Sequence, residues 1–152
     1  MTLREPSSFA DLAVIRLLFE EYGASLGVDL SFQDFEKELA SLPGDYARPQ
    51  GRLWLAMMGG EAAGCVGLRL FDQESCEMKR LYVRPIHRGR GIGKHLASTA
   101  IETAKNLGYR RMYLDTLASM SGAIALYRAL GFKEMAAYRF NPLPALYFQL
   151  EF

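Results

Sequence analysis

The sequence has few of the residues that bind metal ions or form disulfides, and it has no segment typical of a membrane span or a signal peptide. Only two cysteines, Cys65 and Cys76, and two histidines, His87 and His95, occur among 152 residues, and they do not have the spacing of a zinc site. No run of about 18 apolar residues is present to span a membrane, and the first residues lack the apolar segment of a signal peptide. We therefore expect no metal, no membrane partner and a cytoplasmic location. We also expect two reduced buried thiols, with a disulfide or a catalytic thiol as the alternatives.

An excess of charge of one sign is also lacking. Lysine and arginine total 18 against 17 acidic residues, which gives a net charge of +1. Such a balance offers no broad basic surface to nucleic acid, so no nucleic-acid partner is expected. Half of the residues are apolar, and no linker, repeat or low-complexity tract divides the chain. The length and composition predict a single domain over residues 1–152.

Three of the 14 glycines fall within one short segment, Arg88-Gly89-Arg90-Gly91-Ile92-Gly93. This segment follows an apolar strand-like run, residues 78–83, and opens a helix-like run that ends near Leu107. Glycines let the backbone approach a ligand closely, and the first N–H groups of a helix have no partner within it. With the helix dipole and the arginines, this turn predicts an anion site that suits a pyrophosphate.

Spacing excludes two nucleotide loops. The phosphate loop of nucleotide triphosphatases needs Gly-Lys followed by Ser or Thr, and here His95 follows Gly93-Lys94. The dinucleotide fingerprint needs a glycine three residues after Gly91, where Lys94 stands. The remaining pattern is Arg-x-x-Gly-x-Gly between a strand and a helix, with a capped helix as the structural alternative.

That pattern resembles the acetyl-coenzyme A loop of the GNAT superfamily of N-acetyltransferases. The ending Ala-x-x-Leu-Tyr-x-x-x-Gly-Phe, residues 123–132, is similar to the last motif of the same superfamily. The order of elements agrees over residues 76–136, and the N-terminal half agrees more loosely. Residues 138–152 look like the C-terminal strand pair of bacterial members of uncertain substrate.

The resemblance implies an α/β (α+β) fold with a mixed, mostly antiparallel central sheet, a splayed parallel strand pair and about four flanking helices. Apolar periodicity predicts helices over residues 12–22, 32–42 and 92–107. Alternation and turn residues predict strands over 53–58, 63–71, 76–83 and 111–116, the first two as a hairpin around two glycines. The apolar spacing of the third strand requires a bulge near Lys79-Arg80.

The resemblance also assigns the coenzyme site. Acetyl-coenzyme A is the expected co-substrate, and the backbone of Leu81, Tyr82 and Val83 would bind its pantetheine arm. Tyr82 alternatively points to the opposite, covered face of the sheet. Many members have an asparagine where Met120 stands here, so that contact is either missing or supplied by Ser119 or Ser121. The pyrophosphate would lie on the amides of Arg88, Gly89, Arg90, Gly91, Ile92, Gly93 and Lys94.

Acetyl transfer needs a polarised thioester carbonyl, a neutral amine and a proton donor for the leaving thiolate. Tyr127 occupies the position of the motif tyrosine that faces the coenzyme sulfur, although its helical apolar stripe also fits a core residue. Glu77, before the bulge, is the candidate base or amine binder, with an ion pair to Lys79 or Arg80 as the alternative. A backbone N–H near Leu81 would polarise the carbonyl.

The acceptor is expected to be a primary amine of a small molecule, an amino acid derivative or a protein. Weaker candidates for its binding are Glu20, Glu21 and Tyr22, for which a solvated helix face is the alternative, and Arg139 and Asn141 on a late loop. Competing functions are a non-catalytic coenzyme A binding module and an acetyltransferase of aminoacyl-tRNA, which the charge balance does not favour. A homodimer is one assembly the resemblance allows.

Overall fold

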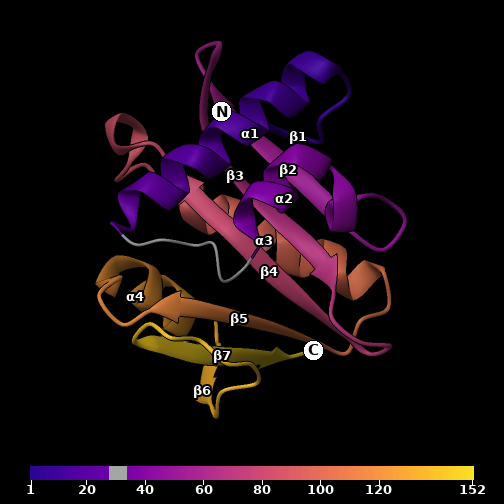
Figure 1. The fold of residues 1–152 in the computed structure, drawn as a ribbon, viewed down its shortest axis with the longest axis vertical. Helices are drawn as coiled ribbons and strands as arrows, with labels where there is room; N and C mark the ends of the chain where they lie inside the picture. Colours follow the sequence, from indigo (N-terminus) through magenta and orange to yellow (C-terminus); the bar gives the residue numbers. More distant parts are fainter. Residues whose placement is uncertain (28–33) are drawn as a thin grey trace.

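The computed structural model describes residues 1–27 and 34–152. Seven strands form one sheet in the order β1-β2-β3-β4-β5-β7-β6 (Figure 1). The strands are β1 (Thr2–Arg4), β2 (Arg52–Met58), β3 (Glu61–Leu70), β4 (Ser75–Val83), β5 (Arg111–Leu117), β6 (Lys133–Met135) and β7 (Ala145–Glu151). The α-helices of the described chain are α1 (Phe9–Ser25), α2 (Phe35–Ser41), α3 (Ile92–Asn106) and α4 (Ser121–Ala129). Short 3₁₀ turns are η2 (Gly44–Tyr46) and η3 (Pro85–His87).

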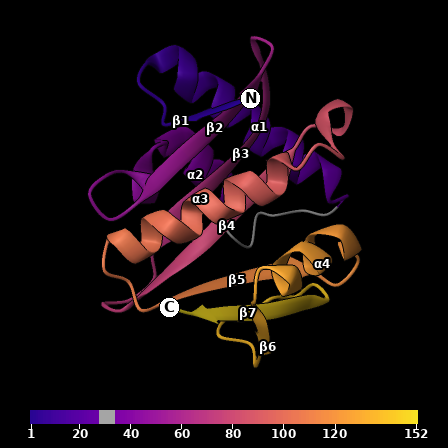
Figure 2. The ribbon, with the colours of Figure 1, turned by 180° about the vertical axis from the view of Figure 1, so that it is seen from behind.

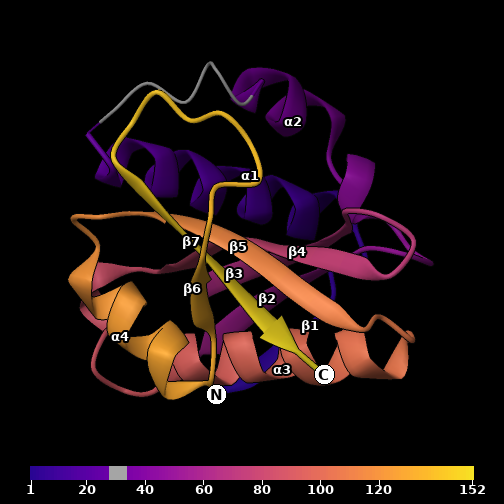
Figure 3. The same cartoon turned by 90° about the horizontal axis from the view of Figure 1, so that it is seen from below.

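The helices cover both faces of the sheet. Helices α1 and α2 lie on one face, and α3 and α4 lie on the other (Figure 3). Ser8 caps α1 by accepting a hydrogen bond from the backbone N–H of Asp11 at 3.1 Å. The buried alanines Ala97, Ala100 and Ala104 let α3 lie close to the sheet. Each face of the sheet thus has its own apolar cluster.

One parallel pair interrupts an otherwise antiparallel sheet. Strands β1 to β4 form an antiparallel meander, α3 crosses over to β5, and β7 pairs antiparallel with both β5 and β6. Strands β4 and β5 are parallel and pair only at residues 75–77 with 111–113. Beyond that short contact the two strands diverge (Figures 1 and 2).

A bulge on β4 accompanies this divergence. Arg80 has φ of 61°, in the left-handed region, and the pairing of β3 with β4 shifts between Cys65 and Gly67. The extra residue bends β4 away from β5. The bulge predicted near Lys79-Arg80 is confirmed, and it opens the sheet between the end of β4 and β5.

The expected mixed sheet with a splayed parallel pair and four helices is confirmed. Two predictions of elements need correction. The expected C-terminal strand pair over residues 138–152 contains one strand, β7, because Pro142 and Pro144 keep the preceding segment out of the sheet. The helix expected over 32–42 runs from Phe35 to Ser41, and residues 32 and 33 lie outside the described chain. Strand β1 was not predicted, since three residues carry too little pattern.

Candidate active site

A cavity of about 540 Å³ lies between the end of β4, the start of α3 and the start of α4. This volume is in the range of ligand pockets in proteins. We call it the coenzyme cavity. It is lined by Ser25, Leu81, Tyr82, Val83, His87, Arg88, Gly89, Gly91, Ile92, Gly93, Ser119, Met120, Ser121, Gly122, Ala123 and Leu126. Ten of the twelve residues predicted for the coenzyme, including both candidate serines, therefore line this one cavity, and Arg90 and Lys94 do not.

The glycine turn leaves the start of α3 open. Gly91 is the N-cap with φ of +79°, and a Cβ placed there would meet no atom within 4 Å. The N–H of His95 donates to the Gly91 carbonyl at 3.0 Å, so the N–H groups of Ile92, Gly93 and Lys94 precede the first helical hydrogen bond. These groups and the helix dipole form an anion site at the cavity wall.

The basic side chains of the turn surround this site. Arg88, Arg90 and Lys94 are exposed. The Nε of Arg88 donates to the Val83 carbonyl at 2.9 Å, which ties the turn to the end of β4. Arg90 in the turn and Lys94 in the first turn of α3 add positive charge close to the open amides along the chain, and neither lines the coenzyme cavity.

Tyr82 is among the residues that line the coenzyme cavity, and its ring packs on the other face of the sheet. Its ring packs in the cluster beneath α1 and lies 6.3 Å from the ring of Tyr22, and its hydroxyl is 3.4 Å from Glu21. The alternative that the ring points to a covered face is therefore the observed one. Leu81 and Val83 instead pack toward the cluster beneath α3.

A second pocket adjoins the coenzyme cavity where β4 and β5 diverge. We call it the inner pocket. It shares Leu81 and Met120 with the coenzyme cavity. Its remaining lining comprises Tyr22, Leu26, Met78, Lys79, Arg80, Asp115, Thr116, Leu117, Tyr127, Asn141 and Leu143. The pocket thus draws on α1, β4, β5, α4 and the loop between β6 and β7.

Tyr127 reaches the inner pocket from α4. Its ring packs against Phe132 and Phe148, and the residue is 7% exposed. Among the described residues, none is hydrogen-bonded to its hydroxyl. Burial raises the pKa of Tyr127 above its ordinary value, with smaller effects of Tyr22 and Asp115 in the same direction. The phenol is therefore protonated at neutral pH and available as a donor.

Glu77 is held in an ionic network beside the inner pocket. Its carboxylate accepts hydrogen bonds from Arg69 at 3.0 Å, from Tyr138 at 2.8 Å and from Arg139. Burial would raise the pKa of Glu77, but the nearby charges of Lys79, Arg69 and Arg139 outweigh it and lower the pKa to about 2. A carboxylate that is so engaged accepts a proton poorly near neutral pH.

The acceptor-side candidates lie in different surroundings. Tyr22 and Asn141 line the inner pocket. Glu20 is exposed on α1, and Glu21 pairs with Arg84 at 2.7 Å. Arg139 pairs with Glu77 rather than lining the pocket. The structure therefore brings together only part of the set predicted for the acceptor.

Sequence reasoning missed the buried pair Lys79 and Asp115. Their side chains are 3.4 Å apart across the diverging strands. Strand alternation in the sequence predicts that Lys79 lies on the same face as Glu77. The sequence did not predict that Asp115 on β5 would be the partner of Lys79. In the described part of the chain, no group of three His, Cys, Asp or Glu residues is placed to hold a metal ion, and no helix there is long and apolar enough to cross a membrane.

Comparison with known proteins identifies the family. A model of the Acetyltransferase (GNAT) family matches residues 13–132. The chain belongs to the GNAT acetyltransferase family. An uncharacterized N-acetyltransferase of Schizosaccharomyces pombe is 41% identical over 144 residues, which cover 93% of this chain and 88% of the relative. The uncharacterized N-acetyltransferase YjgM of Escherichia coli is 36% identical over 138 residues, which cover 89% of this chain and 80% of the relative.

Solved structures share the fold of this GNAT chain. The structure of YncA from Salmonella typhimurium with its cofactor acetyl-CoA has a TM-score of 0.75 at 24% identity, and covers 99% of this chain and 93% of that one. This likeness concerns the fold. With the family match and the named relatives, the chain is an acetyl-CoA-dependent N-acetyltransferase, as the glycine turn and the tyrosine motif predicted.

Proposed function

We propose that this GNAT enzyme transfers the acetyl group of acetyl-coenzyme A directly to a primary amine of a small molecule, an amino acid derivative or a protein, within a ternary complex. The observation that supports this most is the junction of the two pockets at Leu81 and Met120. A thioester that reaches from the coenzyme cavity to this junction would meet the amino group of an acceptor at the inner pocket, whose volume of about 30 Å³ has room for that group and little more.

The coenzyme would bind through the open amides of the glycine turn and the unpaired edge of β4. The pyrophosphate is assigned to the turn over residues 88–94, and the peptide-like pantetheine arm to the backbone of residues 81–83. Both segments line the coenzyme cavity. A backbone N–H near Leu81 would polarise the carbonyl, since the bulge frees this part of β4 from pairing with β5. Ser119 and Ser121 stand on the opposite wall for the arm.

Tyr127 is assigned as the proton donor to the leaving thiolate. The amine nitrogen attacks the carbonyl carbon, the carbon–sulfur bond breaks, and the sulfur takes the phenolic proton. Tyr127 lines the inner pocket, and its raised pKa keeps the phenolic proton in place until charge develops on sulfur. The retained tyrosine also favours an enzyme over a non-catalytic coenzyme A binding module.

A covalent acetyl-cysteine route has no support in the geometry. Cys65 and Cys76 are free and buried, and neither lines the coenzyme cavity or the inner pocket. Burial raises the pKa of Cys65 strongly and that of Cys76 to about 12. A thiol in that state is a poor nucleophile. Two reduced thiols also suit the cytoplasm, where we place the enzyme.

Glu77 fits a positioning role better than that of the base. Its pKa of about 2 and its three donors leave it little basicity. It fixes Arg139 and Tyr138, which belong to the loop that carries Asn141 into the inner pocket. We propose that this loop and Tyr22 shape the acceptor site, with Asn141 in its lining and Arg139 held by Glu77 outside that lining.

A panel of amines tests the proposed function. The protein is mixed with acetyl-coenzyme A and single amines: amino acids, their amides, polyamines and peptides. Release of free thiol is followed, and mass spectrometry identifies the acetylated amine. We expect thiol release that depends on one class of amine and is matched by its acetylated product. Tight binding of the coenzyme without transfer to any amine would instead favour the binding module.

A further inference from the structure

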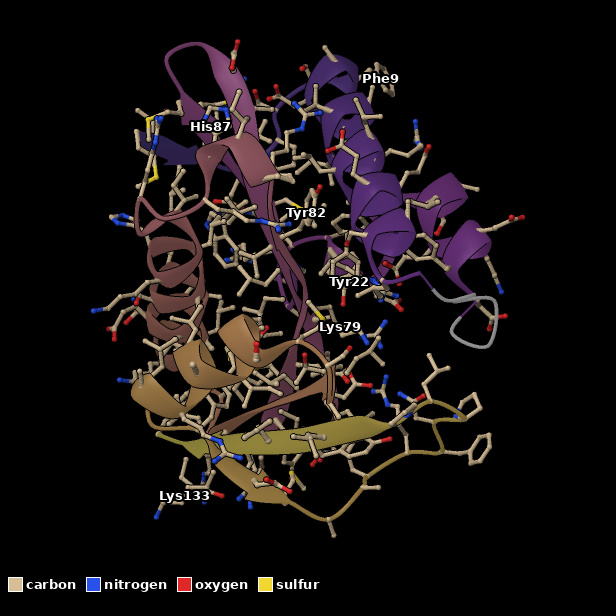
Figure 4. All side chains as sticks on the ribbon, turned by 90° about the vertical axis from the view of Figure 1, so that its left-hand side faces the viewer. Phe9, Tyr22, Lys79, Tyr82, His87 and Lys133 are labelled. Atoms are coloured by element: carbon tan, nitrogen blue, oxygen red, sulfur yellow. The ribbon has the colours of Figure 1, made fainter. Side chains whose placement is uncertain are left out.

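Lys79 is a buried amine beside the reacting groups. Its side chain is 4% exposed, it lies on β4 just before the bulge, and its Nζ is 3.4 Å from Oδ1 of Asp115 on β5. Both residues line the inner pocket together with Tyr127. Figure 4 shows Lys79 below Tyr22, in the interior between α1 and β7. Desolvating an amine is costly, and a buried ion pair adds little net stability. Its position in a pocket suggests chemistry.

The surroundings of Lys79 are mixed in charge. Asp115 faces it from β5, Glu77 and Arg80 flank it on β4, and Arg69 approaches from β3. Tyr22 of α1, Tyr127 of α4 and Asn141 of the β6–β7 loop complete the lining of the same pocket. Of the two anions, Glu77 is shared with Arg69 and Arg139. Asp115 is therefore the anion committed to Lys79.

We propose that Lys79 is the general base that takes a proton from the acceptor's ammonium group, with Asp115 as its positioning partner. This inference rests on the proposed function, because it needs an amine in the inner pocket. It assigns to Lys79 the role that Glu77 cannot fill with its carboxylate fully engaged.

The proton balance closes with these groups. The bound ammonium gives one proton to neutral Lys79 Nζ, and the free amine attacks the thioester carbon. The carbon–sulfur bond breaks, and Tyr127 gives its proton to sulfur. The second proton of the attacking nitrogen returns to Tyr127 by way of water. The products are the amide, coenzyme A with a free thiol, and a protonated Lys79, which releases one proton to solvent.

The protonation state of Lys79 is compatible with this role. Burial lowers the pKa of Lys79 to about 8, against the opposing effect of Asp115. About a tenth of the amines are then neutral at pH 7, against less than about 0.1% for an ordinary lysine. A base with a pKa near the working pH is the effective kind. Because the ion pair contributes to the titration, the measured value belongs to the pair.

The first test is the pH dependence of kcat at saturating acceptor in Lys79→Arg, which keeps the charge and cannot act as a base. In the wild type, kcat rises with pH through an apparent pKa near 8 and then levels. In K79R we expect kcat at pH 7.5 to fall by about 10²-fold or more. We also expect the break in the plot of kcat against pH, near pH 8 in the wild type, to vanish. Lys105→Met, at an exposed lysine paired with Glu102, is the control and keeps the wild-type profile.

Asp115→Asn provides a second, independent readout. The charge of Asp115 raises the pKa of Lys79, so its removal lowers that pKa and moves the break in kcat to lower pH. A merely structural ion pair would change stability and leave the break in place. Carbon NMR titration of the lysine side chains, assigned with K79R, measures the same shift without turnover. We expect one lysine to titrate near pH 8.

Several results overturn the proposal. One is a K79R variant with the kcat of the wild type and an unchanged break in its pH profile. Another is an NMR titration in which every lysine has a pKa above 10. If K79R fails to fold, the double variant Lys79→Met/Asp115→Asn removes both charges together, and wild-type turnover in it overturns the base role. Failure of the proposed function looks different: the wild type transfers acetyl to no amine, and both proposals fall together.

Discussion

At the scale of a single residue, the hydroxyl of Tyr127 separates catalysis from packing. Tyr127→Phe keeps the ring against Phe132 and Phe148 and removes only the hydroxyl group. We expect kcat to fall by about 10²-fold, the lower end of general acid catalysis, because water replaces part of the function. The affinity for the coenzyme stays within about twofold. Turnover of a found acceptor, calorimetry and a thermal melt measure the three quantities.

Tyr109→Phe is the matched control. The Tyr109 hydroxyl donates to the Gln50 carbonyl at 2.8 Å, away from both pockets. Its loss should cost about 1 kcal/mol of stability and leave kcat unchanged. Wild-type turnover in the Tyr127 variant, with a loss of stability like that of the control, would make Tyr127 a core residue.

Gly91 is the residue that tests the anion site. Gly91→Val places a side chain in the open space over the first amides of α3, where we place the pyrophosphate. We expect the Kd for coenzyme A to rise by more than about 100-fold, since charge-assisted hydrogen bonds of about 1.5–3 kcal/mol each are lost. Calorimetry of the folded variant gives the value.

The variant Gly108→Val controls for the backbone strain that Gly91→Val introduces. Gly108 has φ of +92° at the other end of α3, and a Cβ there also meets no atom within 4 Å. Gly108→Val therefore imposes similar strain without touching the coenzyme cavity, and its affinity should equal that of the wild type. Equal affinities in the two variants would remove the pyrophosphate from the turn.

At the scale of the elements, the site is the divergence of β4 from β5. The two strands pair over residues 75–77 and 111–113 and separate after the bulge. If the pantetheine arm fills this separation, hydrogen exchange of the amides of residues 81–83 should slow when coenzyme A binds. The paired amides of residues 75–77 change less and serve as the internal reference. Equal slowing of both groups would mean that the arm binds elsewhere.

Most elements were predictable from local signals. Two adjacent glycines predicted the hairpin of β2 and β3, and the irregular apolar spacing on β4 predicted the bulge at Arg80. The order of β7 between β5 and β6 was not predictable, because pairing between distant strands leaves no local pattern. The same holds for the loop before β7, whose position depends on its contacts with Glu77.

At the scale of the whole molecule, Glu77 links that loop to the sheet and makes stability depend on pH. Its folded pKa of about 2 lies below the unfolded value of 4.5, so its contribution is present above pH 4.5 and is lost as pH falls toward 2. The contribution is on the order of 3 kcal/mol at pH 7 and falls by about half by pH 3.

Glu77→Gln tests this linkage. The difference in free energy of unfolding between wild type and variant should be larger at pH 7 than at pH 3. Glu102→Gln, at an exposed residue of α3, is the control and shows no such change. A difference that is equal at both pH values would mean that Glu77 is not held as a low-pKa carboxylate.

The chemistry of the site was only partly predictable for a related reason. The glycine turn and Tyr127 were predictable because each belongs to a motif of residues that are neighbours in the sequence. The ion pair of Lys79 with Asp115 joins residues on separate strands at 3.4 Å. The engagement of Glu77 by Arg69 and Arg139 joins three segments. Contacts between charged groups that form only on folding set the pKa of each acid and base in the site, and local sequence patterns do not contain these contacts.

Direct transfer from coenzyme to amine is tested most directly by following a labelled acetyl group through one turnover. Protein and acetyl-coenzyme A labelled in the acetyl group are mixed without acceptor, and an active amine from the panel is then added. Direct attack predicts that the label stays on the coenzyme until the amine arrives. The label then appears on the amine with one thiol released for each amide, and the protein stays unlabelled. Label on Cys65, Cys76 or any other residue before the amine is added, and its loss afterwards, would contradict direct transfer.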